Sequence, residues 1–372
     1  MARGLRLSEV GVRRARVHGQ LLGEHDAGRD VAGVVSTVVG VQAQDLAAAA
    51  VCIWARAPDL RIGDVLAAAG RDPSIVLTWS LRGTRHLHHA ADLRWLVGLV
   101  GPVLNRPGRR AAQLGTAGDA GDRAVATVRA ALSEGPLTRS EIKQRLAPLG
   151  IDVSGQAPIH VLQRAGIEGI LVILPDPHGE ERYLLTDDWV PAARAIDPDE
   201  APAMLASRYL AAYGPATPED FRAWSGLPSA AARQAWAAAA GEMAEIDGPA
   251  GRMWILEERR NAVLAAAGRP GPLRLTGGFD TLLGGYRDRS LHLGPEQAPM
   301  VNPGGGLVKP TVVDDGRVVG TWRYLRERPH DRIEVTLFRQ VPRRDLTGEV
   351  AGVGRFLGTD PALDLVAGPE AV

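Results

Sequence analysis

A repeated order of helices and strands constrains the fold of this chain more than any other sequence feature. In one copy, apolar periodicity and turn residues predict helices over 122–133, from Thr138-Arg-Ser-Glu141 and over 156–168, then strands over 170–174 and 182–186. The two strands flank Pro175–Glu180, which predicts a hairpin with a long tip. Three helices followed by a hairpin make a winged helix.

The same order occurs twice more. Helices are predicted over 202–213, from Thr217 through Trp224 and over 228–241, with strands near 243–246 and 252–257. The N-terminal part fits the order less tightly, with helices over 7–20, 29–39 and 46–57 and strands over 75–80 and 84–88. We interpret both as further winged helices.

From about residue 272 the sequence becomes alternating and glycine-rich. Strand-like segments cover 273–276, 306–313, 317–322 and 332–338, Asp314-Asp-Gly316 predicts a hairpin turn, and 343–357 predict a closing helix. The predicted fold class is α+β, with three tandem winged-helix domains and a C-terminal β-barrel or sheet domain. We place the domains at 1–118, 119–198, 199–268 and 269–372.

Composition is typical of a soluble protein of several domains. The chain has 372 residues, 45% of them hydrophobic, and no apolar run near the ~20 residues of a membrane span. Residues 1–8 lack the apolar core of a signal peptide, and the single cysteine, Cys52, has no internal disulfide partner. We expect a cytoplasmic protein without membrane contact, in which Cys52 is a small buried side chain.

Charge and fold together favour a specific nucleic-acid partner. The net charge is zero, which argues against nonspecific coating of nucleic acid. Lys143 and Lys309 are the only lysines, and arginine suits bidentate phosphate contacts, although a GC-rich genome gives the same bias. Tandem winged helices are typical of DNA binding, and a protein–protein scaffold is the alternative. Arginine-rich turns at 80–89 and 285–289 favour DNA.

Gln42 and Gln44 are the candidate catalytic pair. On a continuous helix, residues two apart point about 200° away from each other, whereas an extended segment directs both amides to one side. Gly40 can end the preceding helix and Asp45 can cap the following one, which favours the extended reading. The alternative is that both glutamines only bond backbone groups in a loop.

Several ordered segments resemble one known family. These are Gly40-Val-Gln-Ala-Gln-Asp45, Leu81-Arg-Gly-Thr-Arg-His86, Tyr213-Gly-Pro-Ala-Thr-Pro-Glu-Asp-Phe221, Phe279-Asp-Thr-Leu-Leu-Gly284 with Tyr286-Arg-Asp-Arg289, and Val313-Asp-Asp-Gly-Arg-Val-Val-Gly-Thr-Trp322. In this order they resemble the AlkZ/YcaQ-like winged-helix DNA glycosylases. The resemblance implies a C-shaped DNA cleft formed by three winged helices and a β domain, and a monomer acting on double-stranded DNA.

The resemblance also implies a substrate class. Gln42 and Gln44 fall on the family's catalytic motif and match its Gln-x-Gln branch, which removes bulky or crosslinked N7-alkylguanine and often protects producers of DNA-alkylating natural products. An N7-alkylguanine is already cationic, so its glycosidic bond breaks without a general acid. Two amides then suffice to hold a water and to stabilise the sugar cation by their dipoles.

Other predicted site residues have a structural alternative beside the functional one. Asp45 could stabilise the sugar cation or only cap a helix. Arg82, Thr84 and His86 are expected to position a phosphate or the active site, or to form a hairpin salt bridge. Asp280, Arg287 and Arg289 are expected to line the cleft, and an internal ion pair is the alternative for Asp280 and Arg287.

No metal or cofactor is expected. His86, His88 and His89 lack accompanying metal-ligand motifs, and the glycines at 302–306 read as a plain turn.

A crosslinked base cannot easily swing into a closed pocket, so a hairpin tip at 175–181 or 314–317 could wedge a groove. The remaining alternative is a non-catalytic winged-helix DNA-binding or regulatory protein.

Overall fold

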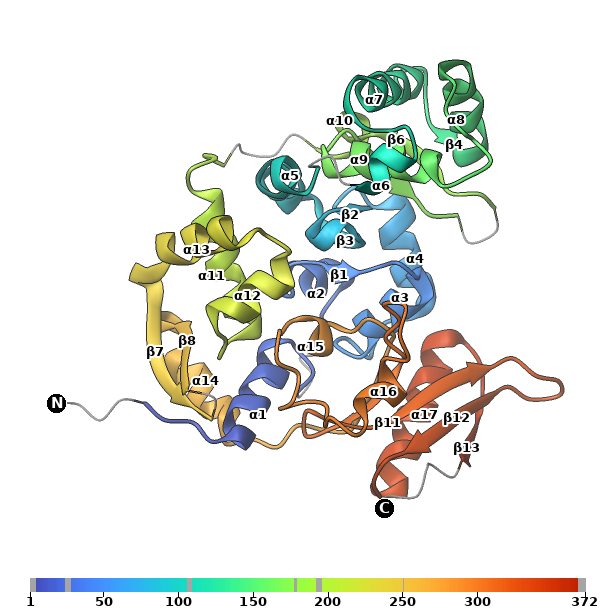
Figure 1. Cartoon of the computed structure of the whole chain (residues 1–372). Coiled ribbons are helices and arrows are strands. Elements are labelled where there is room, and N and C mark those ends of the chain that lie inside the picture. The colour runs from blue at the N-terminus through green and yellow to red at the C-terminus, as the bar shows by residue number, and fades with distance from the viewer. Residues whose placement is uncertain are drawn as a thin grey trace.

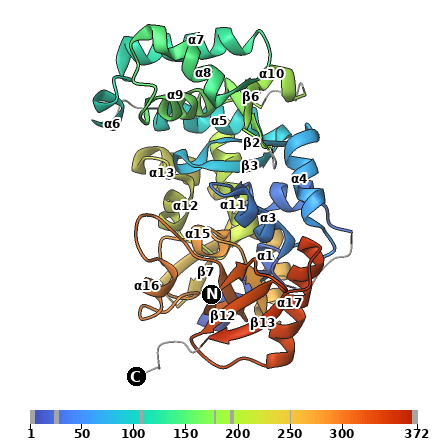
Figure 2. The same ribbon diagram turned by 90° about the vertical axis from the view of Figure 1, so that its right-hand side faces the viewer.

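The computed structural model describes residues 5–23, 28–105, 109–176, 179–191, 196–249 and 251–366. Figure 2 shows an elongated molecule, and in both views (Figures 1 and 2) α7 to α9 lie at one end and α17 with its sheet lies at the other. Segments around β1 and α15 lie between these ends. Among the described residues, no helix is long and apolar enough to cross a membrane.

The first two groups of elements share one six-stranded sheet, in the order β1-β3-β2-β5-β6-β4. The first group is α2 (Val31–Thr37), β1 (Val41–Gln42), α3 (Leu46–Trp54), α4 (Ile62–Arg71), β2 (Ile75–Trp79), η1 (Leu81–Gly83), β3 (Arg85–His89), α5 (Ala90–Leu104) and α6 (Arg109–Gln113). The second is α7 (Gly118–Leu132), β4 (Leu137–Thr138), α8 (Arg139–Leu146), η2 (Ala147–Leu149), α9 (Ala157–Ile167), β5 (Leu171–Leu174), β6 (Arg182–Leu185) and α10 (Thr186–Trp189). Leu77 pairs with Ile173 where the two hairpins join.

Local signals account for the second group. Thr138 accepts a hydrogen bond from the Glu141 backbone N–H, and the Glu141 carboxylate accepts one from the Thr138 backbone N–H, so the predicted helix start is confirmed as a capping box. The predicted strands at 170–174 and 182–186 are β5 and β6. Of the predicted tip at 175–181, residues 177 and 178 lie outside the described residues.

The third group packs around an aromatic core. It contains α11 (Ala201–Tyr213), α12 (Pro218–Ser225), α13 (Ser229–Ala238), η3 (Ala240–Glu242), β7 (Met243–Gly248), β8 (Gly251–Leu256), η4 (Glu257–Arg259) and α14 (Arg260–Ala267). The core rings are Tyr209, Tyr213, Phe221, Trp224 and Trp236, in mutual contact. Such ring pairs stabilise beyond the area they bury.

The N-terminal helix α1 (Glu9–Gly19) also packs on this third group. Leu7 and Val12 bury their side chains against Ile246 and Met253 of the β7–β8 hairpin. The sequence grouped this helix with the first copy, because neighbours in sequence are the simplest packing partners. The helix contacts are instead long-range.

The C-terminal region is an open five-stranded sheet, in the order β13-β12-β11-β10-β9. Its elements are β9 (Arg274–Thr276), α15 (Thr281–Gly284), α16 (Ala298–Val301), β10 (Thr311–Asp314), β11 (Arg317–Leu325), β12 (Arg332–Leu337), α17 (Arg343–Leu357) and β13 (Ala362–Val366). Helix α17 has the bounds predicted for the closing helix. Strand β13 pairs parallel to β12 and was not predicted.

The hairpin turn before β11 is confirmed, and its tip contacts α1. Asp315 and Gly316 both have positive φ, as a two-residue hairpin turn requires. The Asp315 carboxylate accepts a hydrogen bond from Arg14 Nε at 2.9 Å, so this tip packs on α1. Asp315 is thus half-buried and Gly316 buried against α1, while Arg317 stays exposed, and the candidate wedge at 314–317 stays a prediction. The β11–β12 hairpin has the tip that extends away from the molecule (Figure 1).

Buried histidines predict an acid-sensitive fold. Burial lowers the pKa of the His88 ring to about 4, and the ring lies against Gly40 with Ser80 Oγ 2.6 Å from its Nε2. The unfolded chain binds this proton near pH 6.5, so His88 stabilises the fold fully above pH 6.5 and loses this contribution as pH falls toward 4. We expect urea denaturation between pH 6.5 and 5 to show a loss of about 1 kcal/mol per pH unit from this histidine.

His88→Gln should have a shallower pH dependence than the wild type in this window. His330→Gln, a change at an exposed position in the β11–β12 tip, is the matched control. Equal slopes for His88→Gln and the wild type would contradict the assignment.

Candidate active site

Gln42 lies on a short strand at the centre of the molecule. Gly40 has φ +109° and follows α2, which directs the chain into β1. Val41 pairs with Leu87 and Gln42 pairs with His86, and the Ala43 N–H donates to the Arg85 carbonyl at 2.8 Å. The predicted extended geometry is confirmed as far as Ala43, whereas Gln44 lies in a bend.

Arg82 fixes the orientation of the Gln42 amide. Arg82 Nη2 donates to Gln42 Oε1 at 2.8 Å, and a guanidinium has no acceptor, so the Gln42 oxygen must face it and the NH₂ group must face away. Arg82 Nη1 donates to the Trp224 carbonyl at 2.5 Å. Burial lowers the pKa of Arg82, which still remains a cation at neutral pH.

The Gln44 amide is exposed and oriented by the backbone. Gln44 Oε1 accepts a hydrogen bond from the Arg85 N–H at 3.0 Å. Gln44 therefore bonds a backbone group, as the alternative of two glutamines in a loop predicts. Because a carbonyl oxygen has two lone pairs, one acceptor position remains available.

Asp280 is held in a buried ion pair, as its structural alternative predicted. Arg56 Nη1 and Nη2 donate to its two carboxylate oxygens at 2.7 and 3.0 Å. Burial opposes ionisation of both groups, but their mutual attraction raises the pKa of Arg56 and lowers that of Asp280. The Asp280 carboxylate also accepts from the Leu282 N–H and caps α15. It is therefore not free to bind DNA.

The following turn presents two arginines. Arg16 lies 3.7 Å from the centre of the Tyr286 ring, and the Arg287 N–H donates to Asp220 at 2.9 Å. These contacts fix the backbone of the turn. Arg289 is half-buried, and among the described residues neither it nor the exposed Arg287 has a side-chain partner. Burial lowers the pKa of Arg289.

A cavity of about 340 Å³ brings these segments together. Five of the nine predicted site residues line it: Gln42, Arg82, Asp280, Arg287 and Arg289. The remaining lining residues are Ala223, Phe279, Gly284, Tyr286, Gly306 and Val308. The cavity thus lies between β1, α12 and α15, which converge in Figure 1.

The other four predicted residues, Gln44, Asp45, Thr84 and His86, do not line this cavity. Asp45 caps α3 by accepting from the Ala47 and Ala48 N–H groups. Thr84 Oγ1 donates to the Leu81 carbonyl and closes the η1 turn. The His86 ring is buried, and burial lowers its pKa well below the usual value, so it is neutral at pH 7. Its Nδ1 lies 3.0 Å from the Thr84 carbonyl, which requires a proton on Nδ1.

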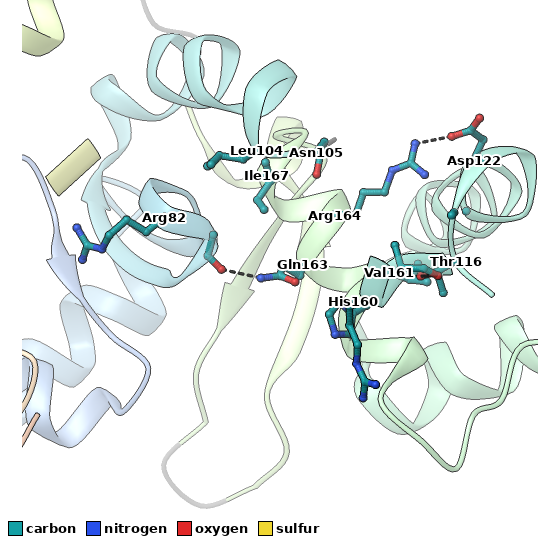
Figure 3. Close-up of a pocket in the computed structure, with 16 residues that line it drawn as sticks. Arg82, Leu104, Asn105, Thr116, Asp122, His160, Val161, Gln163, Arg164 and Ile167 are labelled. Carbon is teal, nitrogen blue, oxygen red and sulfur yellow. Dashed lines mark hydrogen bonds and ion pairs between the residues drawn. The ribbon is translucent and has the colours of Figure 1, made fainter. Parts of the chain in front are cut away.

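A larger cavity of about 530 Å³ lies on the opposite side of the η1 turn. Figure 3 shows Arg82 directed away from it, while Gln163 Nε2 donates to the Gly83 carbonyl at 2.6 Å. Arg164 on its wall is paired with Asp122 and Glu168. The smaller cavity is the candidate active site, because it contains Gln42 and arginines without acid partners among the described residues.

No group of three or more histidine, cysteine, aspartate or glutamate side chains that could hold a metal occurs in the described part of the chain. Cys52 is buried beside Asp280, and burial raises the pKa of its thiol. It is therefore a neutral packing group, as predicted.

Two buried arginines that hold residues of the cavity wall, Arg56 and Arg16, were not predicted from the sequence. Arg56 is fully buried and Arg16 nearly so. A detectable signal was present, because an arginine that ends the apolar stretch Leu46–Ala55 needs a buried partner. The partner, Asp280, could not be identified from spacing because it is 224 residues away.

Comparison with known proteins identifies the family of this chain. A family model described as DNA glycosylase AlkZ-like matches residues 35–358. The chain is 31% identical over 347 residues to an interstrand DNA cross-link repair glycosylase of Streptomyces sahachiroi, covering 87% of this chain and 90% of that protein. The structure of this chain matches that of the Streptomyces sahachiroi DNA glycosylase AlkZ with a TM-score of 0.85 and 27% identity. The match covers 98% of this chain and 100% of AlkZ.

The fold and site thus define a DNA repair enzyme, a DNA glycosylase. The chain belongs to the AlkZ-like DNA glycosylase family. The alternative of a non-catalytic regulatory protein is set aside by this membership.

The buried ion pair predicts a stability signature. Asp280→Ala leaves the Arg56 charge buried without a partner and should lower the free energy of unfolding by about 3–5 kcal/mol in urea denaturation. The double variant Arg56→Met/Asp280→Leu removes both charges and should recover a large part of this loss.

Glu334→Ala, which breaks a pair with the exposed Arg323, is the control and should change stability little. A double variant as unstable as Asp280→Ala would show that the charge left without a partner is not the cause.

Proposed function

We propose that this enzyme hydrolyses the N-glycosidic bond of bulky or crosslinked N7-alkylguanine in double-stranded DNA. The main support for this proposal is the cavity in which Gln42 lies with Arg287 and Arg289. These two cations have no acid partners among the described residues. Phosphates are the anions that such arginines bind in DNA complexes. The cross-link repair named for its Streptomyces sahachiroi relative supports a crosslinked substrate.

The chemistry follows from the absence of an available acid. Asp280 is the one carboxylate among the described residues that line the cavity, and Arg56 neutralises it. A neutral base would need a proton to leave. In N7-alkylguanine the electron pair of the C1′–N9 bond instead neutralises the charged ring, and the oxygen of water bonds to C1′ while its proton passes to solvent. The products are free alkylguanine and an abasic site.

The two amides would act on the sugar and the water. Each carbonyl oxygen keeps a lone pair beside the one that Arg82 or Arg85 occupies. That lone pair can orient the water or face the positive charge that develops at C1′. Both amides are oriented before substrate binds, so little reorganisation is needed during the reaction.

The DNA is proposed to lie in a C-shaped cleft between three winged helices and the C-terminal sheet, with a monomer acting alone. The helix and hairpin groups at 118–189 and 201–256 support two of these units. A role in self-resistance to a DNA-alkylating natural product fits a substrate of this kind. Asp45, Thr84 and His86 would support the site by holding the backbone around Gln42 and Arg82.

The direct test uses an oligonucleotide duplex that contains one N7-alkylguanine. We expect release of the modified base and an abasic site, measured in single turnover. Gln42→Ala and Gln44→Ala should each lower this rate about a hundredfold, equivalent to roughly 3 kcal/mol of lost transition-state stabilisation.

Gln234→Ala, an exposed amide on α13, is the matched control and should keep the wild-type rate. Wild-type rates in both Gln42→Ala and Gln44→Ala would overturn the catalytic assignment, and binding without base release by the wild type would overturn the proposed substrate.

A second prediction concerns uncharged bases. Uracil in the same sequence context should not be released detectably, because two amides stabilise an anionic leaving group poorly. The comparison is the amount of free base under conditions in which N7-methylguanine is fully excised. Uracil release at a similar rate would require a different mechanism.

A further inference from the structure

Two residues with a left-handed backbone face the same small cavity. Arg82 has φ 57° and Phe279 has φ 61°, and both line the cavity beside Gln42. A bulky side chain is disfavoured in this conformation, which glycine adopts freely. Strained residues of this kind are concentrated at functional sites. The conformation of Arg82 is explained by its hydrogen bond to Gln42, whereas that of Phe279 serves no contact described so far.

The surroundings of Phe279 force its conformation. A side chain at Gly277 would meet the Ala48 carbonyl at 2.1 Å, and one at Gly278 would meet the Val308 carbonyl at 2.8 Å. The chain is therefore held closely between α3 and residue 308. On the other side, the Asp280 carboxylate is fixed by Arg56. Phe279 has little freedom to relax, so its side chain is held at the cavity wall.

The Phe279 ring is not used in packing against other aromatic rings. None of the ring contacts among the described residues includes it, and the residue is partly exposed. Tyr286 is the other aromatic residue of the cavity wall, but it lies under Arg16 and its hydroxyl bonds Gln20 and the Tyr213 carbonyl. Phe279 is therefore the aromatic group that remains available to a ligand.

We propose that Phe279 is a specificity-determining residue whose ring stacks on the alkylated purine. This rests on the proposed function, since the ligand is the cationic N7-alkylguanine itself. An aromatic face attracts a cation, so the ring favours the alkylated base over an unmodified one. The strained backbone persists because the residue must present this ring beside Gln42.

The test compares Phe279→Gly with Phe279→Tyr in the full-length enzyme. Glycine removes the ring and the backbone strain together, so the melting temperature should stay within a few degrees of the wild type. Single-turnover release of N7-methylguanine from duplex DNA should fall tenfold or more. Tyrosine keeps the ring and should retain the rate within about threefold.

Leu21→Gly is the matched control, because Leu21 has φ 62° and does not line this cavity. It should keep the wild-type rate. A wild-type rate in Phe279→Gly, or equal rate losses in the Gly and Tyr variants, would overturn the role of the ring. A large fall in melting temperature of Phe279→Gly would identify a packing role instead.

Failure of the proposed function would be recognised separately. If the wild type releases no base, the ratio of Kd values for undamaged and N7-methylguanine duplexes decides the stacking inference. Loss of that preference in Phe279→Gly would support the inference, and an unchanged ratio would overturn it.

Discussion

The buried guanidinium of Arg56 is the interaction on which the rest of the site depends. Its five N–H groups donate to the Gln20 and Cys52 carbonyls, to both oxygens of Asp280 and to Thr281 Oγ1. Burying two charges costs several kcal/mol of solvation, which good geometry offsets only when every donor is satisfied. The pair thereby joins α3, the end of α1 and the start of α15 in one register. Loss of this ion pair would displace the cavity wall that faces Gln42.

A second arginine extends this register to the remaining elements. Arg82 donates to Gln42 on β1 and to the Trp224 carbonyl at the end of α12, so it bridges the first and third groups. Its close approach requires a glycine at 226, where a side chain would meet the Arg82 backbone at 2.9 Å. The candidate cavity is therefore assembled from segments around residues 42, 82, 223 and 280. It exists only when these groups are packed together.

Local signals made much of the fold predictable. The capping boxes at Thr138 and Thr217, the turn at Asp315 and helix α17 all depend on neighbouring residues. Helix α4 was missed because two glycines weaken its helical pattern, and β13 because it is a short edge strand with little buried surface.

The motifs indicated which residues approach the cavity, but not what each one does. Asp280 belongs to the predicted site but forms an ion pair with Arg56, a partner that only tertiary packing brings close. Similarly, the orientation of the Gln42 amide follows from Arg82, 40 residues away.

The charges of the cavity constrain the order of events under the proposed function. Arg82, Arg287 and Arg289 would oppose a positive charge developing at C1′ if they remained without counterions. Phosphates that bind Arg287 and Arg289 cancel this repulsion, so the site becomes favourable for a sugar cation only after the DNA backbone is in place. Arg82 differs, because its charge is turned toward the Gln42 oxygen and the Trp224 carbonyl. Backbone binding and bond cleavage are thus coupled through the same arginines, and neutral amides can serve where a carboxylate would have formed an ion pair with them.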